Sequence, residues 1–230
     1  MSMQQLFASG LLAIAGAAQA GPLDLAATLT YEYHSVTADG VVKDSRFQEK
    51  LYRVGNQVWT ERILPANTPH NDAGHDEHKH KHKHKHDLGL AAAAKHVVRD
   101  ARGNLNLDFV RRADRQIIHA EQRDYAELGF DGSWAGAYYI VNPLQLQKMQ
   151  KLKRPAAAGQ VWYEQQQQDR FVRVLWSETR QIPLLIESGS SNGNLYARTA
   201  IKPEAMPQLN QLPWNRLAGY RRKDYVDLLD

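Results

Sequence analysis

The chain has 230 residues, enough for one large domain or two small ones, and 43% of them are hydrophobic, as in soluble globular proteins. A mean hydropathy of −0.58 argues against an integral membrane protein. The formal charge of +4 is too small to indicate a nucleic-acid partner. The sequence contains no cysteine, which excludes disulfides, thiolate metal sites and thiol catalysis and predicts no lipoprotein anchor.

The first twenty residues predict a secretory signal peptide that ends before Gly21. An apolar run from Leu6 to Ala18 leads into the small-residue pattern Ala-Gln-Ala. The run is too short for a transmembrane helix, and no basic residue precedes it. We therefore expect residues 1–20 to be removed on export, and residues 21–230 to form a single β-rich domain in the periplasm.

Strand patterns dominate the segment that follows. Residues 29–36 are rich in β-branched and aromatic side chains, and Ala-Asp-Gly at 38–40 indicates a turn before a second strand at 41–54. Gly-Asn at 55–56 is a two-residue hairpin signal before the alternating stretch 57–64. These patterns predict three consecutive antiparallel strands.

Residues 65–95 interrupt the strands and show no hydrophobic period. Loops of this length inside a compact domain are uncommon and are usually either functional or disordered. We therefore predict a disordered insertion between neighbouring strands, with one helical turn at 90–95.

Further strand patterns follow the insertion, together with one helix. Asn142 and Pro143 suit the start of a helix that continues through LQLQKMQKLK as far as Pro155. The expected strands and other segments are 96–100, 105–113, 116–128, a turn with an aromatic cluster at 130–141, hairpins at 159–178 and 182–202, and a terminal helix or docked segment at 212–230. The sequence predicts a mainly β (α+β) protein with about nine strands in an antiparallel sheet, buried on one face.

Residues 170–203, RFVRVLWSETRQIPLLIESGSSNGNLYARTAIKP, resemble the LolA/LolB/RseB-like periplasmic fold. The shared features are a strand ending in Trp, a turn, a Leu-Pro-type strand, an Asn-Gly turn and a return strand. The resemblance implies a curved half-barrel with one or two helices packed on its concave face, which binds a lipid or a lipidated peptide. The Arg-Pro-Gly-Arg-Phe-x-Trp stretch of that family is absent, and residues 45–59 are its nearest analogue. The resemblance therefore gives no site residues.

The stretch HDEHKHKHKHKHD, from His75 to Asp87, is the clearest candidate site. Its candidate metal ligands are His75, His78, His80, His82, His84 and His86. Neutral imidazole is a common ligand for Zn, Cu and Ni. In an extended chain alternate residues lie about 6.6 Å apart, whereas a Zn–N bond is about 2.0 Å, so adjacent rings share an ion only where the loop bends.

The lysines between these histidines weaken a metal site without abolishing it. A divalent ion and an ammonium group about 7 Å apart repel by roughly 1 kcal/mol in water, before salt screening. The tract therefore predicts weak, exchangeable binding of Zn, with Cu or Ni as alternatives. Two other hypotheses are an inert solvated loop and a polycation whose imidazoles gain charge near pH ~6.5.

The other candidate residues carry weaker signals. Isolated histidines at 34, 70, 96 and 119 are more typical of satisfied or half-exposed positions than of ligands, and Glu121, Asp124 and Glu127 are expected on solvated strand faces. One stretch, residues 189–193, has the G-x-S-x-G spacing but lies in a predicted hairpin turn, and no H-E-x-x-H or Gly-rich phosphate motif is present, which argues against an enzyme. One aromatic set suits either a lipophilic groove or the core, namely Trp59, Trp134, Tyr138, Tyr139, Trp162, Trp176 and Trp214.

We therefore interpret the chain as a non-enzymatic, exported binding protein whose flexible His-rich loop binds or buffers a transition metal ion. The alternative, which the resemblance implies, is a periplasmic carrier or sensor of a lipid or lipidated peptide, with the His tract incidental. An envelope protein is a further expected partner under that alternative, and nucleic acid is not.

Overall fold

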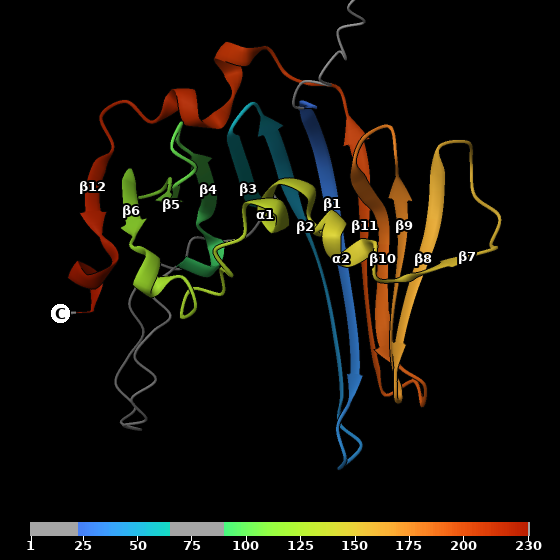
Figure 1. The fold of residues 1–230 in the computed structure, drawn as a ribbon. Helices are drawn as coiled ribbons and strands as arrows, with labels where there is room; N and C mark the ends of the chain where they lie inside the picture. Colours follow the sequence, from blue (N-terminus) through green and yellow to red (C-terminus); the bar gives the residue numbers. More distant parts are fainter. Residues whose placement is uncertain (1–22, 65–89, 230) are drawn as a thin grey trace, which may run out of the picture.

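The computed structural model describes residues 23–64 and 90–229, which form twelve strands in one open sheet (Figure 1). The strands are β1 (Leu25–Val36), β2 (Val42–Val54), β3 (Gln57–Ile63), β4 (Ala94–Arg99), β5 (Leu105–Arg111), β6 (Gln116–Ala120), β7 (Gln150–Leu152), β8 (Gln160–Gln167), β9 (Arg170–Ser177), β10 (Ile182–Ser190), β11 (Leu195–Glu204) and β12 (Arg221–Asp224). The helices are α1 (Trp134–Tyr139) and α2 (Pro143–Leu146), with 3-10 turns η1 (Leu90–Ala92), η2 (Gln122–Asp124), η3 (Leu209–Gln211), η4 (Pro213–Arg216) and η5 (Tyr225–Leu228).

The strand order is β12-β6-β5-β4-β3-β2-β1-β11-β10-β9-β8-β7. Every pair is antiparallel except β12 with β6. The mainly β prediction is confirmed, but the expected count of about nine strands was too low. The short edge strands β7 and β12, QKL and RRKD, have no hydrophobic alternation, so only their pairing with β8 and β6 identifies them.

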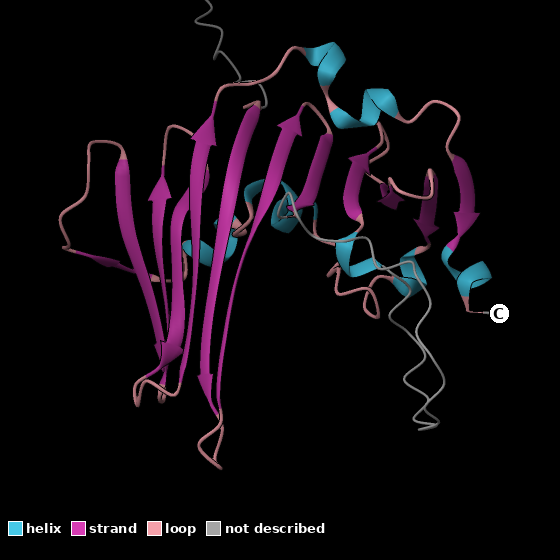
Figure 2. Ribbon diagram, turned by 180° about the vertical axis from the view of Figure 1, so that it is seen from behind, coloured by secondary structure: helices cyan, strands magenta, loops and turns pink. Residues whose placement is uncertain are grey.

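Two short helices lie on the concave face of the curved sheet (Figure 1), and the view from behind shows the convex face in front of them (Figure 2). The prediction of one or two helices there is confirmed. The helix expected from Asn142 to the residues before Pro155 was wrong in length, because α2 ends at Leu146. Leu146 is buried against the sheet, and the chain then forms backbone hydrogen bonds as β7 at the edge of β8, which outweighs the local helix propensity.

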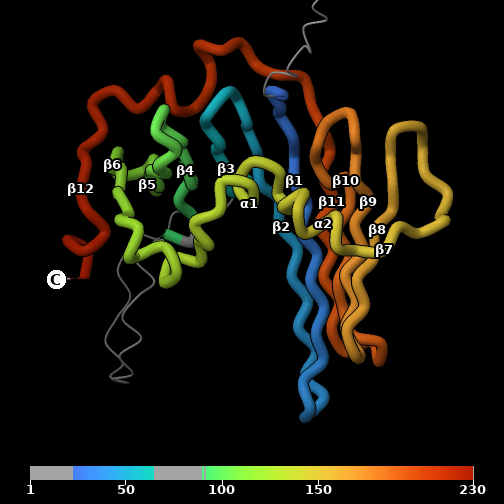
Figure 3. The backbone as a smooth tube through the Cα atoms, viewed as in Figure 1, coloured from blue at the N-terminus to red at the C-terminus, as the bar shows by residue number. Residues whose placement is uncertain are grey.

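The sheet is covered differently along its width. Across β4 to β6, the concave face packs against Tyr125 and Phe130 from the segment that follows β6. The convex face there packs against Trp214, Leu217 and Tyr220. These last residues belong to the C-terminal segment, which runs from β11 to β12 along one end of the sheet (Figure 3). This part of the sheet is therefore buried on both faces.

In the other half, from β1 to β8, most of the core lies on the concave side. There Leu25, Ala27 and Leu29 of β1 pack with Tyr138 of α1. Alternate residues of a strand point to opposite faces, so Ala26, Thr28 and Thr30 of β1 lie on the convex side, where Ala26 is buried and the two threonines are partly exposed. No helix in the described part of the chain is long and apolar enough to cross a membrane.

Two of the turns predicted within hairpins are confirmed. Gly55, with a φ of +56°, lies between β2 and β3, and the Asn192–Gly193 turn joins β10 to β11. The predicted signal peptide lies outside the described residues. So does most of the predicted insertion, since the described chain resumes at Leu90 and β4 begins at Ala94.

Candidate functional site

A cavity of about 510 Å³ lies on the concave face between the α1–α2 segment and strands β8, β9 and β10. Its lining contains six apolar side chains and several polar groups. The lining residues are Asp131, Ser133, Gly136, Ile140, Val141, Asn142, Gln145, Met149, Gln165, Val172, Val174 and Ile186. This volume falls within the range of roughly 300–1,000 Å³ that is usual for sites of small ligands.

The strand side of the cavity is apolar along β9 and β10 because of the pairing register, and Gln165 of β8 is its polar member. Val174 of β9 lies opposite Ile186 of β10, and Val172 lies opposite Gln165 of β8. Val174 is buried, whereas Val172 is 38% exposed. The hydrophobic core therefore continues outward along β9 into a surface that the helices leave open.

The helical wall is fixed by local caps. Ser133 Oγ accepts a hydrogen bond from Gly136 N at 2.9 Å and begins α1. Asn142 Oδ1 accepts one from Leu144 N at 2.9 Å and begins α2. Between the helices, Ile140 has a φ of +67°. A β-branched residue rarely adopts this left-handed conformation, which costs about 1–3 kcal/mol and occurs most often at functional sites.

The buried Arg53 of β2 anchors α1 to the sheet. Its guanidinium donates to the carbonyl oxygens of Leu23, Tyr138 and Arg180 at 2.8, 3.0 and 3.0 Å. It also lies 4.5 Å from the centroid of the Tyr138 ring. Burial lowers the pKa of Arg53 from its ordinary value, but arginine remains charged in proteins. Charge-assisted hydrogen bonds therefore hold the C-terminal end of α1, and with it one wall of the cavity.

The polar groups of the lining differ in how they are engaged. Asp131 Oδ1 accepts from Ser133 N at 2.9 Å, so Asp131, Ser133 and Asn142 already accept backbone hydrogen bonds. Gln145 and Gln165 are exposed, and within the described residues their side-chain amides have no protein partner. These two amides are the groups best placed to meet a polar part of a ligand.

The predicted metal ligands, His75 to His86, lie outside the described residues, as does the histidine at position 70. The other histidines lie on the convex face, where each has a partner. His34 Nδ1 is 2.7 Å from Asp44, His96 Nε2 is 3.0 Å from Gln57, and His119 Nδ1 is 2.9 Å from Asp108. No cluster of three or more metal-ligating side chains occurs in residues 23–64 and 90–229. The expectation of satisfied or half-exposed histidines is confirmed for these three.

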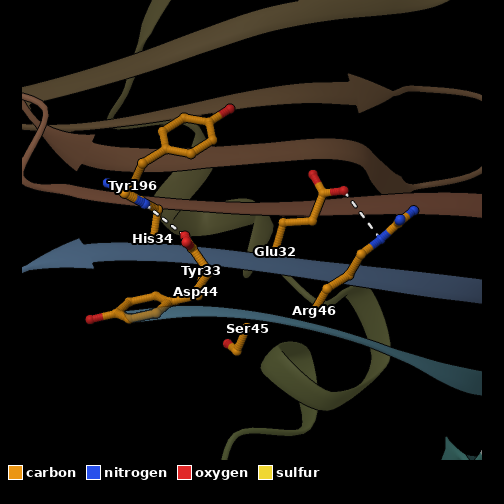
Figure 4. Close-up of a pocket in the computed structure, with 7 residues that line it drawn as sticks. All are labelled: Glu32, Tyr33, His34, Asp44, Ser45, Arg46 and Tyr196. Carbon is orange, nitrogen blue, oxygen red and sulfur yellow. Dashed lines mark hydrogen bonds and ion pairs between the residues drawn. The ribbon is translucent and has the colours of Figure 1, made fainter. Parts of the chain in front are cut away.

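A second, shallower pocket of about 480 Å³ lies over β1, β2 and β11 (Figure 4). Its charged side chains are paired with one another. Arg46 Nε lies 3.4 Å from Glu32, and His34 pairs with Asp44 beside the Tyr196 ring. Because these charges are already matched, this pocket gives a weaker basis for ligand recognition than the concave cavity.

The seven aromatic residues that suited either a lipophilic groove or the core belong to the core. None of the seven lines the concave cavity. Trp59, Tyr138, Trp162 and Trp176 are buried, and the others pack against hydrophobic clusters. They form the core, and the groove interpretation was wrong for them.

Three carboxylates were expected on strand faces, namely Glu121, Asp124 and Glu127. They lie instead at the η2 turn and in the loop after it. Asp124 Oδ2 accepts from Glu121 N at 3.1 Å, and Glu127 accepts from Tyr225 Oη at 3.0 Å. The strand predicted at 116–128 was too long, because β6 ends at Ala120.

Sequence reasoning missed most of the cavity. Its lining comes from Asp131 to Met149 and from three separate strands, so no local motif contains it. One signal was present, since Ser133 followed by Trp-Ala-Gly-Ala-Tyr-Tyr is a possible helix start of the N-cap type. Recognising α1 would have placed a second helix on the sheet, but not the gap beneath it.

The fold and the cavity define a β-rich protein with a ligand-sized hollow on the concave face of a curved antiparallel sheet. No protein-family model matches the sequence, and no curated protein matches it. Similar solved structures include an uncharacterized conserved protein from Thermus thermophilus, with 9% identity, a TM-score of 0.39, and coverage of 87% of this chain and 90% of that chain.

MucB is similar at 13% identity with a TM-score of 0.38, over 84% of this chain and 58% of that chain. An outer membrane lipoprotein-sorting protein domain from Vibrio parahaemolyticus is similar at 12% identity with a TM-score of 0.30, over 84% of this chain and 89% of that chain. These matches are consistent with the LolA/LolB/RseB-like fold predicted from residues 170–203, and they concern the fold alone.

Proposed function

We propose that this chain is a non-enzymatic periplasmic binding protein that holds the apolar part of a lipid or lipidated peptide in the concave cavity. The observation that carries the proposal is the cavity itself, with about 510 Å³ of space beside Val172, Val174 and Ile186. Apolar surface gains roughly 25 cal/mol for each Å² removed from water. An acyl chain laid along this wall would cover apolar surface that is now exposed.

The lining favours an amphiphile over a purely apolar ligand. Apolar side chains form the strand wall, while Gln145 and Gln165 present amides at the exposed side. Pockets that take small molecules commonly combine such an apolar wall with a few polar groups that set orientation. The strained Ile140 between α1 and α2 adds support, because it keeps the chain turned around the cavity at a conformational cost.

A matched pair of substitutions tests this proposal. Val172 and Val226 are 38% and 36% exposed, and only Val172 lines the cavity. We expect Val172→Trp to weaken binding of a fluorescent acyl-chain probe at least tenfold by filling the cavity, while Val226→Trp binds the probe like the unmodified protein. Native mass spectrometry of the purified proteins should show co-purifying lipid only where the cavity is open. Equal probe affinity in all three proteins would contradict the proposal.

A second proposed activity is weak, exchangeable binding of Zn, with Cu or Ni as alternatives, by the His tract. It is supported by the density of imidazoles, six within residues 75–86. This activity is independent of the cavity, because none of the cavity residues belongs to the tract. Either activity can therefore fail in experiment without affecting the other.

A further inference from the structure

A basic segment borders one end of the concave cavity. Residues 148–154, KMQKLKR, contain three lysines and one arginine and no acidic residue. The segment leaves α2, supplies Met149 to the cavity lining and continues as the edge strand β7. Its lysines and arginine are exposed. A positively charged edge therefore lies directly beside the hollow.

Two lysines of this segment are placed close to the cavity. Lys151 lies opposite Tyr163 of β8 in the pairing register, and its Nζ is 5.7 Å from the centroid of the Tyr163 ring. Tyr163 packs in the same concave-face cluster as Met149 and Val174, so the Lys151 ammonium is on the cavity side. Lys148 N donates to the carbonyl oxygen of the cavity residue Gln145 at 3.0 Å.

The lysine charges are not matched by the protein. Within the described residues, no carboxylate oxygen lies within 4.0 Å of the amines of Lys148, Lys151 or Lys153. The nearest acidic strand residue, Glu164, alternates to the other face from Tyr163 and is engaged by Arg173 at 2.6 Å. The lysines near the cavity therefore present a net positive field to the ligand.

The other end of the cavity has the opposite charge. Asp131 lies before α1, and its carboxylate accepts from Ser133 N. An anionic group would be repelled at this end and attracted at the β7 end. The cavity is thus polarised along its length, with the apolar wall of β9 and β10 between the two ends.

We propose that the ligand is an anionic amphiphile, whose phosphate or carboxylate is bound by Lys148 and Lys151 while its acyl chain lies against Val172 and Val174. This inference rests on the proposed function and adds the chemistry of the head group and its orientation. Each ammonium near an anionic head group contributes roughly fivefold in affinity at low salt. Lysine rather than arginine suits this role as a point charge without a required geometry.

Two lysophospholipids with the same acyl chain test the inference in the full-length protein. We expect lysophosphatidylglycerol, which is anionic, to bind about 25-fold more tightly than zwitterionic lysophosphatidylcholine at low salt, with roughly fivefold from each lysine and the difference shrinking as salt is added. Lys148→Glu/Lys151→Glu should remove this preference, because reversing both charges weakens binding of the anionic lipid far more than binding of the zwitterionic one. Inorganic phosphate at matched concentration should not displace either lipid.

The control is Lys43→Glu/Lys223→Glu, which changes the net charge equally at two exposed lysines outside the cavity. It should keep most of the anionic preference. Equal binding of both lipids by the unmodified protein, an equal loss in both double variants, or displacement by inorganic phosphate would overturn the inference while leaving acyl-chain binding in place. Binding of neither lipid would instead reject the proposed function, and the inference with it.

Discussion

Arg198 of β11 donates from Nη1 to Glu32 of β1 at 3.1 Å, and this pair lies within a row of six alternating charges on the convex face. The row crosses six neighbouring strands from β8 to β2 through Glu164, Arg173, Glu187, Arg198, Glu32 and Arg46, each opposite the next in the pairing register. One further ion pair within the row joins Arg173 Nε to Glu164 Oε1 at 2.6 Å. Because a slip of one residue would turn a strand's charge into the concave core, the row helps to fix the register.

Reversing one charge of this row is expected to destabilise the fold in a salt-dependent way. Arg198→Glu would place a third carboxylate between Glu32 and Glu187. Cross-strand charge pairs contribute about 0.2–1 kcal/mol each, so we expect the unfolding free energy to fall by about 1–2 kcal/mol at low salt. Urea denaturation at low and high salt measures the effect.

Arg170→Glu is the control, since Arg170 is exposed and has no ion pair within the described residues. It should cost less than Arg198→Glu at low salt. A loss at Arg198 that is the same at both salt concentrations would show that packing, rather than the alternating charges, is responsible.

The charge row also shows what sequence alone could and could not give. The alternation of residues 170–178 and the Asn192–Gly193 turn predict the β8–β9 and β10–β11 hairpins, because these depend on residues close in the chain. The neighbour of Arg198 on its other side is Glu32, far away in sequence. No local pattern reveals that β1 pairs with β11, and so the row is visible only in the assembled sheet.

The cavity escaped prediction for the same reason. The helix predicted through LQLQKMQKLK includes Met149, whereas Met149 lies beyond α2, next to β7. Local helix propensity favours a longer α2, whereas hydrogen bonding to the edge of β8 favours strand β7. The second effect prevails, and it depends on tertiary structure that the local sequence does not show. The aromatic residues drew attention as groove candidates, but large rings fill the core and the smaller Val172 and Ile186 remain at the opening.

Metal binding by the His tract is tested by removing residues 75–87. We expect calorimetric titration with Zn to show weak binding in the intact protein and none in the deletion variant. The melting temperature should change little, because the deletion leaves β3, β4 and their immediate flanks intact. Cu and Ni titrations under the same conditions would rank the metals.

The lysines of the tract provide a second test of the same site. Replacing the lysines at 79, 81, 83 and 85 with glutamine should strengthen metal binding at low salt, since each removes roughly 1 kcal/mol of repulsion before screening. The gain should shrink as salt is added. Heat of binding that survives the deletion would assign the metal to another part of the chain.

His96 is expected to make stability depend on pH. Its ring is buried between Trp59 and Trp214, with centroid distances of 5.4 and 5.6 Å, and Nε2 donates to Gln57 Oε1 at 3.0 Å. Burial lowers the pKa of His96 to about 4, with a smaller opposing effect of Asp108 and a further lowering by Arg222. In the unfolded chain the pKa of histidine is about 6.5.

The direction of the effect follows from proton binding. Between pH ~6.5 and about 4 the unfolded chain binds a proton at this residue and the folded chain does not, so acidification favours unfolding. The contribution of His96 to stability is complete above the unfolded pKa and falls by about 3 kcal/mol as the pH approaches the folded pKa. Urea denaturation followed by tryptophan fluorescence between pH 7 and 4.5 measures it.

His96→Phe separates this effect from the titration of carboxylates. The phenyl ring keeps an aromatic group between Trp59 and Trp214 but cannot bind a proton, so the variant should lose less stability than the unmodified protein across this pH range. His34→Gln changes a half-exposed histidine and should retain the full loss, because His96 is still present. If His96→Phe and the unmodified protein lose the same free energy between pH 7 and 4.5, His96 is protonated in the folded state and the contact with Trp214 does not exclude the charged ring.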